Sequence, residues 1–131
     1  MNARGRVLLV DDDANILLTL HALLTDELDI EIAGDIATAY RALDASTFGL
    51  VACDFRLAGG NGLDVLRYAR KRDPHVLGIV WTGREELVEA RTQADDFRVI
   101  LKTESPEFVL QVVRQSVAIA ALRQSTRELR L

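Results

Sequence analysis

The sequence predicts an α/β domain built on a parallel central sheet. Short apolar runs alternate five times with segments in which apolar residues recur at helical spacing. Four of these runs lack the alternation of a half-exposed strand, which is typical of parallel strands covered on both faces. Repeated strand and helix units favour right-handed crossovers within one sheet. The chain has 131 residues, 49% hydrophobic and 27% charged, so it fits one folded domain with a sizeable core.

Five segments are the predicted strands. They are residues 7–10, 30–33, 50–53, 76–81 and 99–101. The second alternates between apolar and polar positions, which predicts an edge strand. The third ends in Cys53, the single cysteine of the chain, so no internal disulfide can form and we expect a buried, reduced thiol.

Helices are predicted between and after the strands. Their apolar positions are Ile16, Leu17, Leu20, Leu23 and Leu24; Ala39, Tyr40 and Leu43; Leu63, Val65, Leu66 and Ala69; Leu87, Val88 and Ala90; and Phe108, Val109, Val112, Val113 and Val117. The fourth helix has the weakest apolar stripe. That weakness is typical of a marginally packed switch region and equally of a solvated surface helix.

The last helix is predicted to begin at Pro106, with Ser105 as its N-cap, and to run to the C-terminus. We divide the chain into a domain of residues 1–121 and a polar extension of residues 122–131. Four positions near this end follow near-heptad spacing, namely Ala118, Leu122, Ser125 and Leu129. The extension is either a helix that forms a homodimer or continues into an output domain, or a frayed polar end.

Polar side chains follow four of the predicted strands directly. Asp11 and Asp12 end the first strand, Asp54 the third, Thr82 the fourth and Lys102 the fifth. Each residue alone is common at such a position. An acidic pair, a carboxylate, a hydroxyl and a lysine in this order are specific as a set.

This set resembles the receiver domain of two-component response regulators, and the resemblance covers the chain from Arg6 to Ala121. It implies a flavodoxin-like, doubly wound sheet with strand order 2-1-3-4-5. It also implies that Asp54 accepts a phosphoryl group from a phosphohistidine, with Thr82 and Lys102 beside that group. The implied partner is a histidine kinase or a histidine phosphotransfer protein. Such a receiver phosphorylates itself and is not a turnover enzyme.

Asp11, Asp12 and Asp54 are expected to meet at the carboxyl edge of the sheet, because strands 1 and 3 are neighbours in that order. Crowded carboxylates repel one another unless their pKa values rise or a cation neutralises them. Mg²⁺ is the expected cation, since it prefers hard oxygen ligands. The resemblance implies direct binding by Asp12, Asp54 and the backbone carbonyl of Arg56, and binding by Asp11 through water. We expect Asp13 instead to cap the first helix.

The loop after Asp54 is rich in glycine and carries an arginine. Its glycines are expected to permit positive φ and a close backbone path around a metal and a phosphate. Arg56 and Arg84 stand two residues after Asp54 and Thr82. We expect them either to pair with phosphate or nearby acids or to remain exposed.

Three positions depart from the family pattern. Ala58 and Thr103 stand where the family usually has prolines, and Val99 replaces the aromatic residue that rotates inward on activation. A cis bond before a non-proline costs about 3 kcal/mol, so the Lys102–Thr103 bond is either strained or trans. We therefore expect phosphotransfer chemistry with an altered conformational output.

Other classes of protein fit less well. The main alternative is a phosphorylation-independent docking module of the same fold, which the three departures favour and the intact site residues oppose. A flavin-binding protein would carry a Ser-, Thr- and Gly-rich loop where this chain has three aspartates. A hydrolase is disfavoured because His21 and His75 lie away from the carboxyl edge.

The overall charge also excludes several partners. The net charge is −4, and no basic stripe favours direct binding of nucleic acid.

The N-terminal apolar run is too short for a signal peptide, and no segment approaches the about 20 apolar residues of a membrane span. These features predict a cytoplasmic protein.

Overall fold

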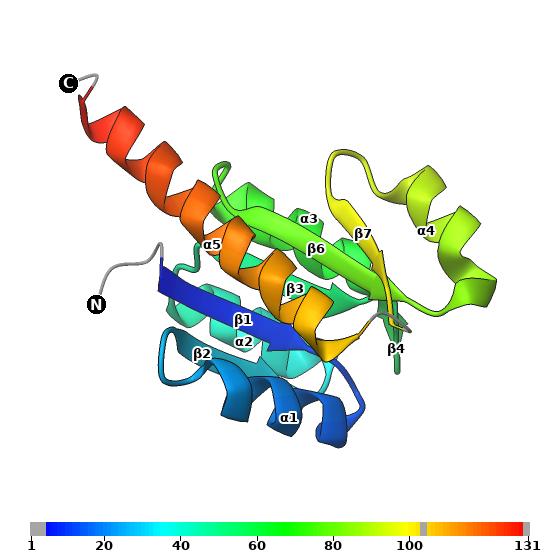
Figure 1. Cartoon of the computed structure of the whole chain (residues 1–131). Coiled ribbons are helices and arrows are strands. Elements are labelled where there is room, and N and C mark those ends of the chain that lie inside the picture. The colour runs from blue at the N-terminus through cyan, green and yellow to red at the C-terminus, as the bar shows by residue number, and fades with distance from the viewer. Residues whose placement is uncertain (1–4, 103–104, 130–131) are drawn as a thin grey trace.

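The computed structural model describes residues 5–102 and 105–129. At its centre is a parallel five-stranded sheet (Figure 1). The strands are β1 (Arg6–Val10), β2 (Asp29–Ala33), β3 (Leu50–Asp54), β6 (Leu77–Thr82) and β7 (Arg98–Leu101). Their order is β2-β1-β3-β6-β7. Counted within this sheet, that is the predicted order 2-1-3-4-5, and the alternating strand β2 lies at an edge, as expected.

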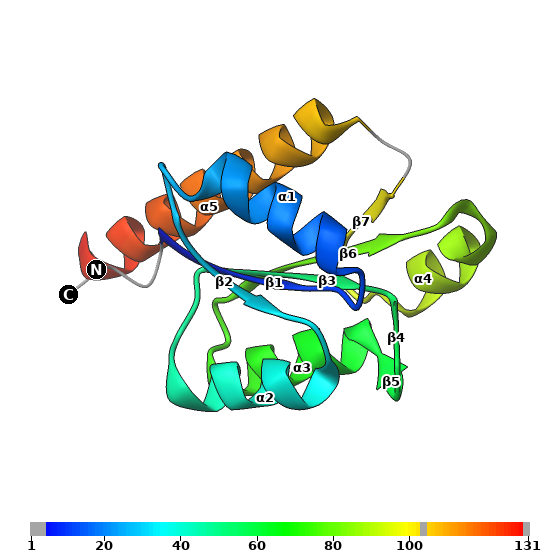
Figure 2. The same ribbon diagram turned by 90° about the horizontal axis from the view of Figure 1, so that it is seen from below.

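Helices cover both faces of the sheet, as predicted. Helices α1 (Ala14–Leu24) and α5 (Pro106–Leu129) lie on one face, and α2 (Ile36–Ala45) and α3 (Gly62–Arg72) on the other (Figure 2). Helix α4 (Leu87–Gln93) follows a 3-10 turn, η2 (Arg84–Glu86), and lies beside the β6 and β7 end of the sheet (Figure 1).

Alternation along the strands creates two apolar layers. Val7, Leu9, Leu50 and Ile79 belong to a buried cluster that includes residues of α1 and α5. The neighbouring positions in the same strands belong to a second cluster with α2 and α3. Strand β3 is buried at all five positions, and Cys53 is a buried free thiol, as predicted.

Side-chain caps fix where several helices begin. The Asp13 carboxylate accepts hydrogen bonds from the backbone amides of Asn15 and Ile16, which confirms the predicted cap of α1. The Ser105 hydroxyl accepts a bond of 3.2 Å from the amide of Phe108 at the start of α5. Asn61 caps α3 in the same way. These caps set the direction in which each helix leaves the sheet edge.

Helix α4 is held only weakly by apolar contacts. Of its three predicted apolar positions, Ala90 is buried, Leu87 is half-buried and Val88 is 77% exposed. The segment begins as a 3-10 turn rather than as α-helix. A short helix with one buried residue needs other attachments, and these are polar.

A short antiparallel ribbon that the sequence did not predict follows the end of β3. Its strands are β4 (Arg56–Leu57) and β5 (Gly60–Asn61). Gly59 turns the chain between them with φ +87°, a conformation that favours glycine. Two-residue strands are too short to leave a periodic sequence signal.

Helix α5 has 24 residues, which corresponds to about 36 Å, and its C-terminal half extends past the sheet (Figure 1). Arg114 ties it to the turn after α1 through a bidentate ion pair with Glu27, at 2.9 and 3.0 Å. Of the near-heptad positions, Ala118 and Leu122 are exposed, and the Leu129 side chain lies outside the described residues. None of the described helices combines the length and apolarity needed to cross a bilayer.

Candidate functional site

Four side chains share one face at the carboxyl edge of the sheet because of strand alternation. Leu9, Ala52, Ile79 and Ile100 all belong to the layer beneath α1 and α5. Two residues further along each strand, the same parity selects Asp11, Asp54, Trp81 and Lys102. The parallel register pairs Asp54 directly with Trp81. The alternation of side chains along four strands therefore places these residues on one face of the sheet.

Lys102 joins the two buried carboxylates. Its Nζ lies 2.9 Å from Asp54 Oδ2 and 3.5 Å from Asp11 Oδ2. Asp11 is 0% exposed and Asp54 is 5% exposed, whereas the Lys102 side chain reaches in from the partly exposed end of β7. One ammonium group therefore serves two negative charges that are largely removed from water.

The pKa of Asp54 is raised, mainly because its carboxylate is buried. Burial raises this pKa from 3.8 to about 6, and the hydrogen bond from Lys102 opposes the rise while the charge of Asp11 adds to it. Burial lowers the pKa of Lys102, but the Asp54 hydrogen bond and the charge of Asp11 outweigh it, so the net shift is upward. Lys102 therefore keeps its positive charge, whereas the ionised form of Asp54 is destabilised.

Asp12 completes a group of three carboxylates. One oxygen from each of Asp11, Asp12 and Asp54 lies within 4.8 Å of the other two. Asp12 is exposed, so the group is open to solvent on one side. Hard oxygen ligands with an open side fit a small divalent cation that keeps some of its waters, and an added positive charge would stabilise the ionised form of Asp54.

The loop after Asp54 approaches the site closely because Gly62 lacks a side chain. A Cβ atom on Gly62 would lie 1.9 Å from the carbonyl oxygen of Asp54 and 2.9 Å from Cys53 Sγ. The Gly62 amide also donates a hydrogen bond of 2.8 Å to the carbonyl of Phe55. Only glycine permits α3 to begin against the backbone of Asp54 in this way.

Comparison with known proteins identifies the family. Residues 7–114 match the response regulator receiver domain. The chain belongs to this family. The matched range carries all of Asp11, Asp12, Asp54, Thr82 and Lys102, and the five-stranded sheet agrees with the receiver fold that the sequence predicted.

Relatives of this receiver domain are longer regulators. It is 27% identical to the hydrogenase transcriptional regulatory protein HoxA of Cupriavidus necator, over 98% of this chain and 27% of that protein. It is 32% identical to the alginate biosynthesis transcriptional regulatory protein AlgB of Pseudomonas putida, over 95% of this chain and 30% of that protein. The chain thus spans less than a third of these two curated relatives.

A solved structure shares the fold along nearly its whole length. The crystal structure of a CheY-like response regulator receiver domain protein from Methanospirillum hungatei is 25% identical, with a TM-score of 0.78. The match covers 91% of this chain and 98% of the other.

One predicted site residue, Thr82, makes its hydrogen bond outside the carboxylate group. Thr82 is buried, and its hydroxyl donates a 3.2 Å hydrogen bond to the carbonyl of Gly83. Among the residues that the structure describes, no hydrogen bond joins the Thr82 side chain to Asp54. The expected strain or trans geometry at Lys102–Thr103 lies outside the described residues.

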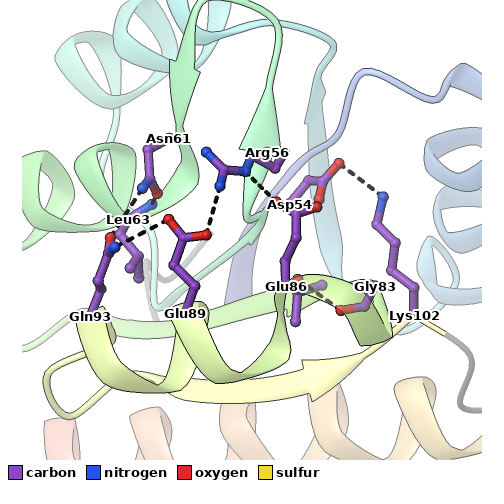
Figure 3. A network of polar contacts seen from close by, with 10 residues as sticks. Asp54, Arg56, Asn61, Leu63, Gly83, Glu86, Glu89, Gln93 and Lys102 are labelled. Atoms are coloured by element: carbon purple, nitrogen blue, oxygen red, sulfur yellow. Dashed lines mark hydrogen bonds and ion pairs between the residues drawn. The ribbon is translucent and has the colours of Figure 1, made fainter.

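Arg56 pairs with one acid in the 3-10 turn η2 and one in helix α4. Its guanidinium donates to Glu86 through Nε and to Glu89 at 2.7 Å (Figure 3). Asn61 then contacts Gln93 at 3.4 Å. These polar contacts attach η2 and α4 to the ribbon that follows Asp54, where apolar contacts are few.

Two features of this receiver site were not identified from the sequence. Trp81, the last residue of the fourth predicted strand, donates a 2.8 Å hydrogen bond from its indole Nε1 to Asp11 Oδ2. Strand parity with Asp54 was a signal that could have found it. The carboxylate partners of Arg56, Glu86 and Glu89, are spaced three apart on one helical face, but nothing in that spacing identifies the arginine.

A cavity of the receiver domain lies away from this site. It measures about 730 Å³ and is lined by residues that include Arg6, Asp44, Phe48 and Arg72. These come from the start of β1, the end of α2 and the end of α3, opposite the carboxyl edge. It contains none of the predicted site residues.

Proposed function

We propose that this receiver domain accepts a phosphoryl group on Asp54 from a phosphohistidine, in a Mg²⁺-dependent phosphorelay step. The observation that carries the proposal is the contact of 2.9 Å between Lys102 Nζ and Asp54 Oδ2, beside Asp11 and Asp12. A lysine held on the acceptor carboxylate is placed to neutralise charge on an arriving phosphoryl group.

The reaction forms one bond and breaks one. A carboxylate oxygen of Asp54 attacks phosphorus, and the P–N bond to the donor imidazole breaks with its electron pair passing to nitrogen. Lys102 exchanges its bond with the carboxylate for one with a phosphoryl oxygen. Thr82 reaches the phosphoryl group only after its hydroxyl leaves the Gly83 carbonyl. Asp54 is consumed in each transfer, so the domain is a self-phosphorylating receiver rather than a turnover enzyme.

Mg²⁺ fits the carboxylate group on chemical grounds. Asp12 and Asp54, with the backbone carbonyl of Arg56, are the proposed direct ligands, and Asp11 acts through water. When bound, Mg²⁺ supplies positive charge that stabilises the transferring oxygens. Asp11 is the most buried of the three carboxylates, and it would add negative charge near the cation without contacting it directly.

The altered output is proposed to pass through Arg56 and helix α4. Val99 is half-buried against the layer beneath α2 and α3, and a valine has no ring to rotate inward. Arg56 follows the acceptor by two residues and pairs with Glu86 and Glu89. A phosphoryl group on Asp54 competes for this guanidinium, which weakens the attachment of α4.

The proposed partners follow from the same chemistry. A histidine kinase or histidine phosphotransfer protein supplies the phosphoryl group in the cytoplasm. The relatives named above are more than three times as long as this chain, so we propose that α5 continues into an output domain or pairs with a second copy. The acidic net charge argues that any contact with nucleic acid is made outside this domain.

The test is intact-mass analysis after incubation with Mg²⁺ and phosphoramidate. We expect a gain of one phosphoryl group, which is lost in Asp54→Ala and when the metal is chelated. No gain in the wild type, together with no binding of Mg²⁺, would replace the proposal with the phosphorylation-independent docking module.

A further inference from the structure

Trp81 is a buried tryptophan that lies at the end of a strand, on the same face as the acceptor Asp54. It is 4% exposed and precedes Thr82 at the end of β6. Its parallel partner in the register is Asp54, so its side chain leaves the sheet on the face that carries the acceptor. The indole N–H is a donor with no acceptor capacity, and burial obliges it to find a partner.

The partner of this N–H is a carboxylate of the site. Trp81 Nε1 donates to Asp11 Oδ2 at 2.8 Å, and the amide of Asp13 donates to Asp11 Oδ1 at 2.9 Å. Each oxygen of a fully buried carboxylate is therefore held by a separate donor. Two donors on opposite oxygens fix the plane of the carboxylate, which one donor alone cannot do.

The same hydrogen bond influences where Lys102 lies. Asp11 Oδ2 is 3.5 Å from Lys102 Nζ, whereas Asp54 Oδ2 is 2.9 Å from it. Because the indole already serves Asp11 Oδ2, the ammonium group is left closer to the acceptor. Without the indole N–H, Asp11 would lack a donor at this oxygen and would draw Lys102 away from Asp54.

We propose that Trp81 is a positioning residue of the phosphoacceptor site, whose indole N–H orients Asp11 toward a bound divalent cation and leaves Lys102 on Asp54. The inference rests on the proposed function, because it concerns the same cation. Trp81 touches neither the phosphoryl group nor the cation and acts through Asp11. Groups that orient ligands in this way typically change metal affinity by about 10- to 100-fold when removed.

The experiment compares Trp81→Phe with Ile79→Val by calorimetric titration with Mg²⁺. Phenylalanine keeps an aromatic ring in the layer but has no N–H. Ile79 lies in the same layer two residues earlier and is buried, so Ile79→Val is a packing control that removes no hydrogen-bond donor. We expect the Kd for Mg²⁺ to rise roughly tenfold in Trp81→Phe and to stay within about twofold of wild type in Ile79→Val.

A spectroscopic readout keeps the inference testable if Trp81→Phe does not fold. The chain has one tryptophan, so its nitrogen–proton spectrum contains one indole signal. That signal should shift during a Mg²⁺ titration of the wild type, with the Kd found by calorimetry.

The two proposals fail in different ways. An unmoved indole signal at saturating Mg²⁺, an unchanged Kd in Trp81→Phe, or an equal loss of affinity in Ile79→Val would overturn the role of Trp81 alone. A wild type that binds no Mg²⁺ would overturn the proposed function together with this inference.

Discussion

The Lys102 ammonium group lies 2.9 Å from Asp54 Oδ2 and 3.5 Å from Asp11 Oδ2, so a single cation is shared between two buried acids at the sheet edge. Asp54 and Lys102 are 48 residues apart in the sequence. Strand β6 separates their strands in the sheet, and only a long side chain spans that distance.

Lys102→Met should damage both chemistry and stability. Loss of the ammonium removes charge stabilisation at the phosphoryl group, for which we expect phosphorylation by phosphoramidate to slow about 10²- to 10³-fold. It also leaves two buried carboxylates without their shared partner, which should lower the free energy of unfolding by about 1–3 kcal/mol at pH 7.5.

Urea unfolding and intact mass measure the two effects of Lys102→Met. Lys71→Gln is the matched control, since Lys71 is the other lysine of the chain and lies exposed in α3. If the two variants slowed phosphorylation equally, the assigned role of Lys102 would be wrong.

The pKa of Asp54 predicts an unusual dependence of stability on pH. Folding raises this pKa from 3.8 to about 6, so between pH 4 and 6 the folded state binds more protons than the unfolded state. The contribution of Asp54 to stability is therefore greatest below pH 4, falls as the pH rises through about 6, and is constant above that. The fall should reach about 2–3 kcal/mol.

Asp54→Asn isolates this contribution because it removes the titration. The unfolding free energy of wild type minus that of Asp54→Asn should decrease from pH 4 to pH 7, measured by urea unfolding without metal. Mg²⁺ should stabilise the wild type at pH 7 and raise its unfolding midpoint. A difference that increases with pH would contradict the raised pKa.

Gly62→Ala tests the close approach of α3 to the acceptor. The added Cβ would lie 1.9 Å from the Asp54 carbonyl, so the backbone must shift, at a cost of about 1–3 kcal/mol in the free energy of unfolding. Phosphorylation should slow as well because Asp54 moves with its backbone.

Gly83→Ala is the control for the Gly62 variant. A Cβ at Gly83 meets no atom within 4 Å, and its φ of −72° is open to alanine. We expect stability within about 0.5 kcal/mol of wild type. Equal losses in the two variants would show that the effect does not come from contact with Asp54.

Glu89→Gln should loosen helix α4. The variant weakens one of the two carboxylate partners of Arg56, so amides of η2 and α4 should exchange hydrogen faster in the unphosphorylated protein. Amides of α2 should keep their rates. Glu85→Gln is the control, because Glu85 is an exposed neighbour in η2 that forms no ion pair among the described residues.

Beryllofluoride, which mimics a phosphoryl group, should reproduce part of that change in the wild type. Faster exchange in α4 on addition of beryllofluoride and Mg²⁺ would support an output through Arg56. Changes confined to β7 and α5 would contradict it.

Strand content was accessible from the sequence because parallel strands buried on both faces leave continuous apolar runs, as in β3. The strand order was implied by the resemblance to receiver domains. The positions of Asp11, Asp54 and Lys102 followed from the ends of these runs. Helix caps such as Asp13 were also predictable, since a cap depends on neighbouring residues only.

Contacts across the fold were not accessible in the same way. Trp81 and Asp11 are 70 residues apart. Strand parity places Trp81 on the face of the site, but it does not select Asp11 as the hydrogen-bond partner. The ribbon of β4 and β5 is too short for a periodic signal. The Thr82 hydroxyl donates to the adjacent Gly83 carbonyl, although its position at the end of a strand suggested a contact with the acceptor Asp54. Strand alternation sets the face on which a side chain lies, whereas its hydrogen-bond partner at the sheet edge depends on tertiary neighbours.

The most direct test of the central claim is to locate the phosphoryl group. After incubation with Mg²⁺ and phosphoramidate, borohydride reduces an aspartyl phosphate to homoserine, and peptide mass mapping finds the altered residue. We predict homoserine at position 54 and unchanged aspartate at positions 11–13. Homoserine at one of positions 11–13, or at no position in a protein that binds Mg²⁺, would contradict the assignment of Asp54 as the phosphoacceptor.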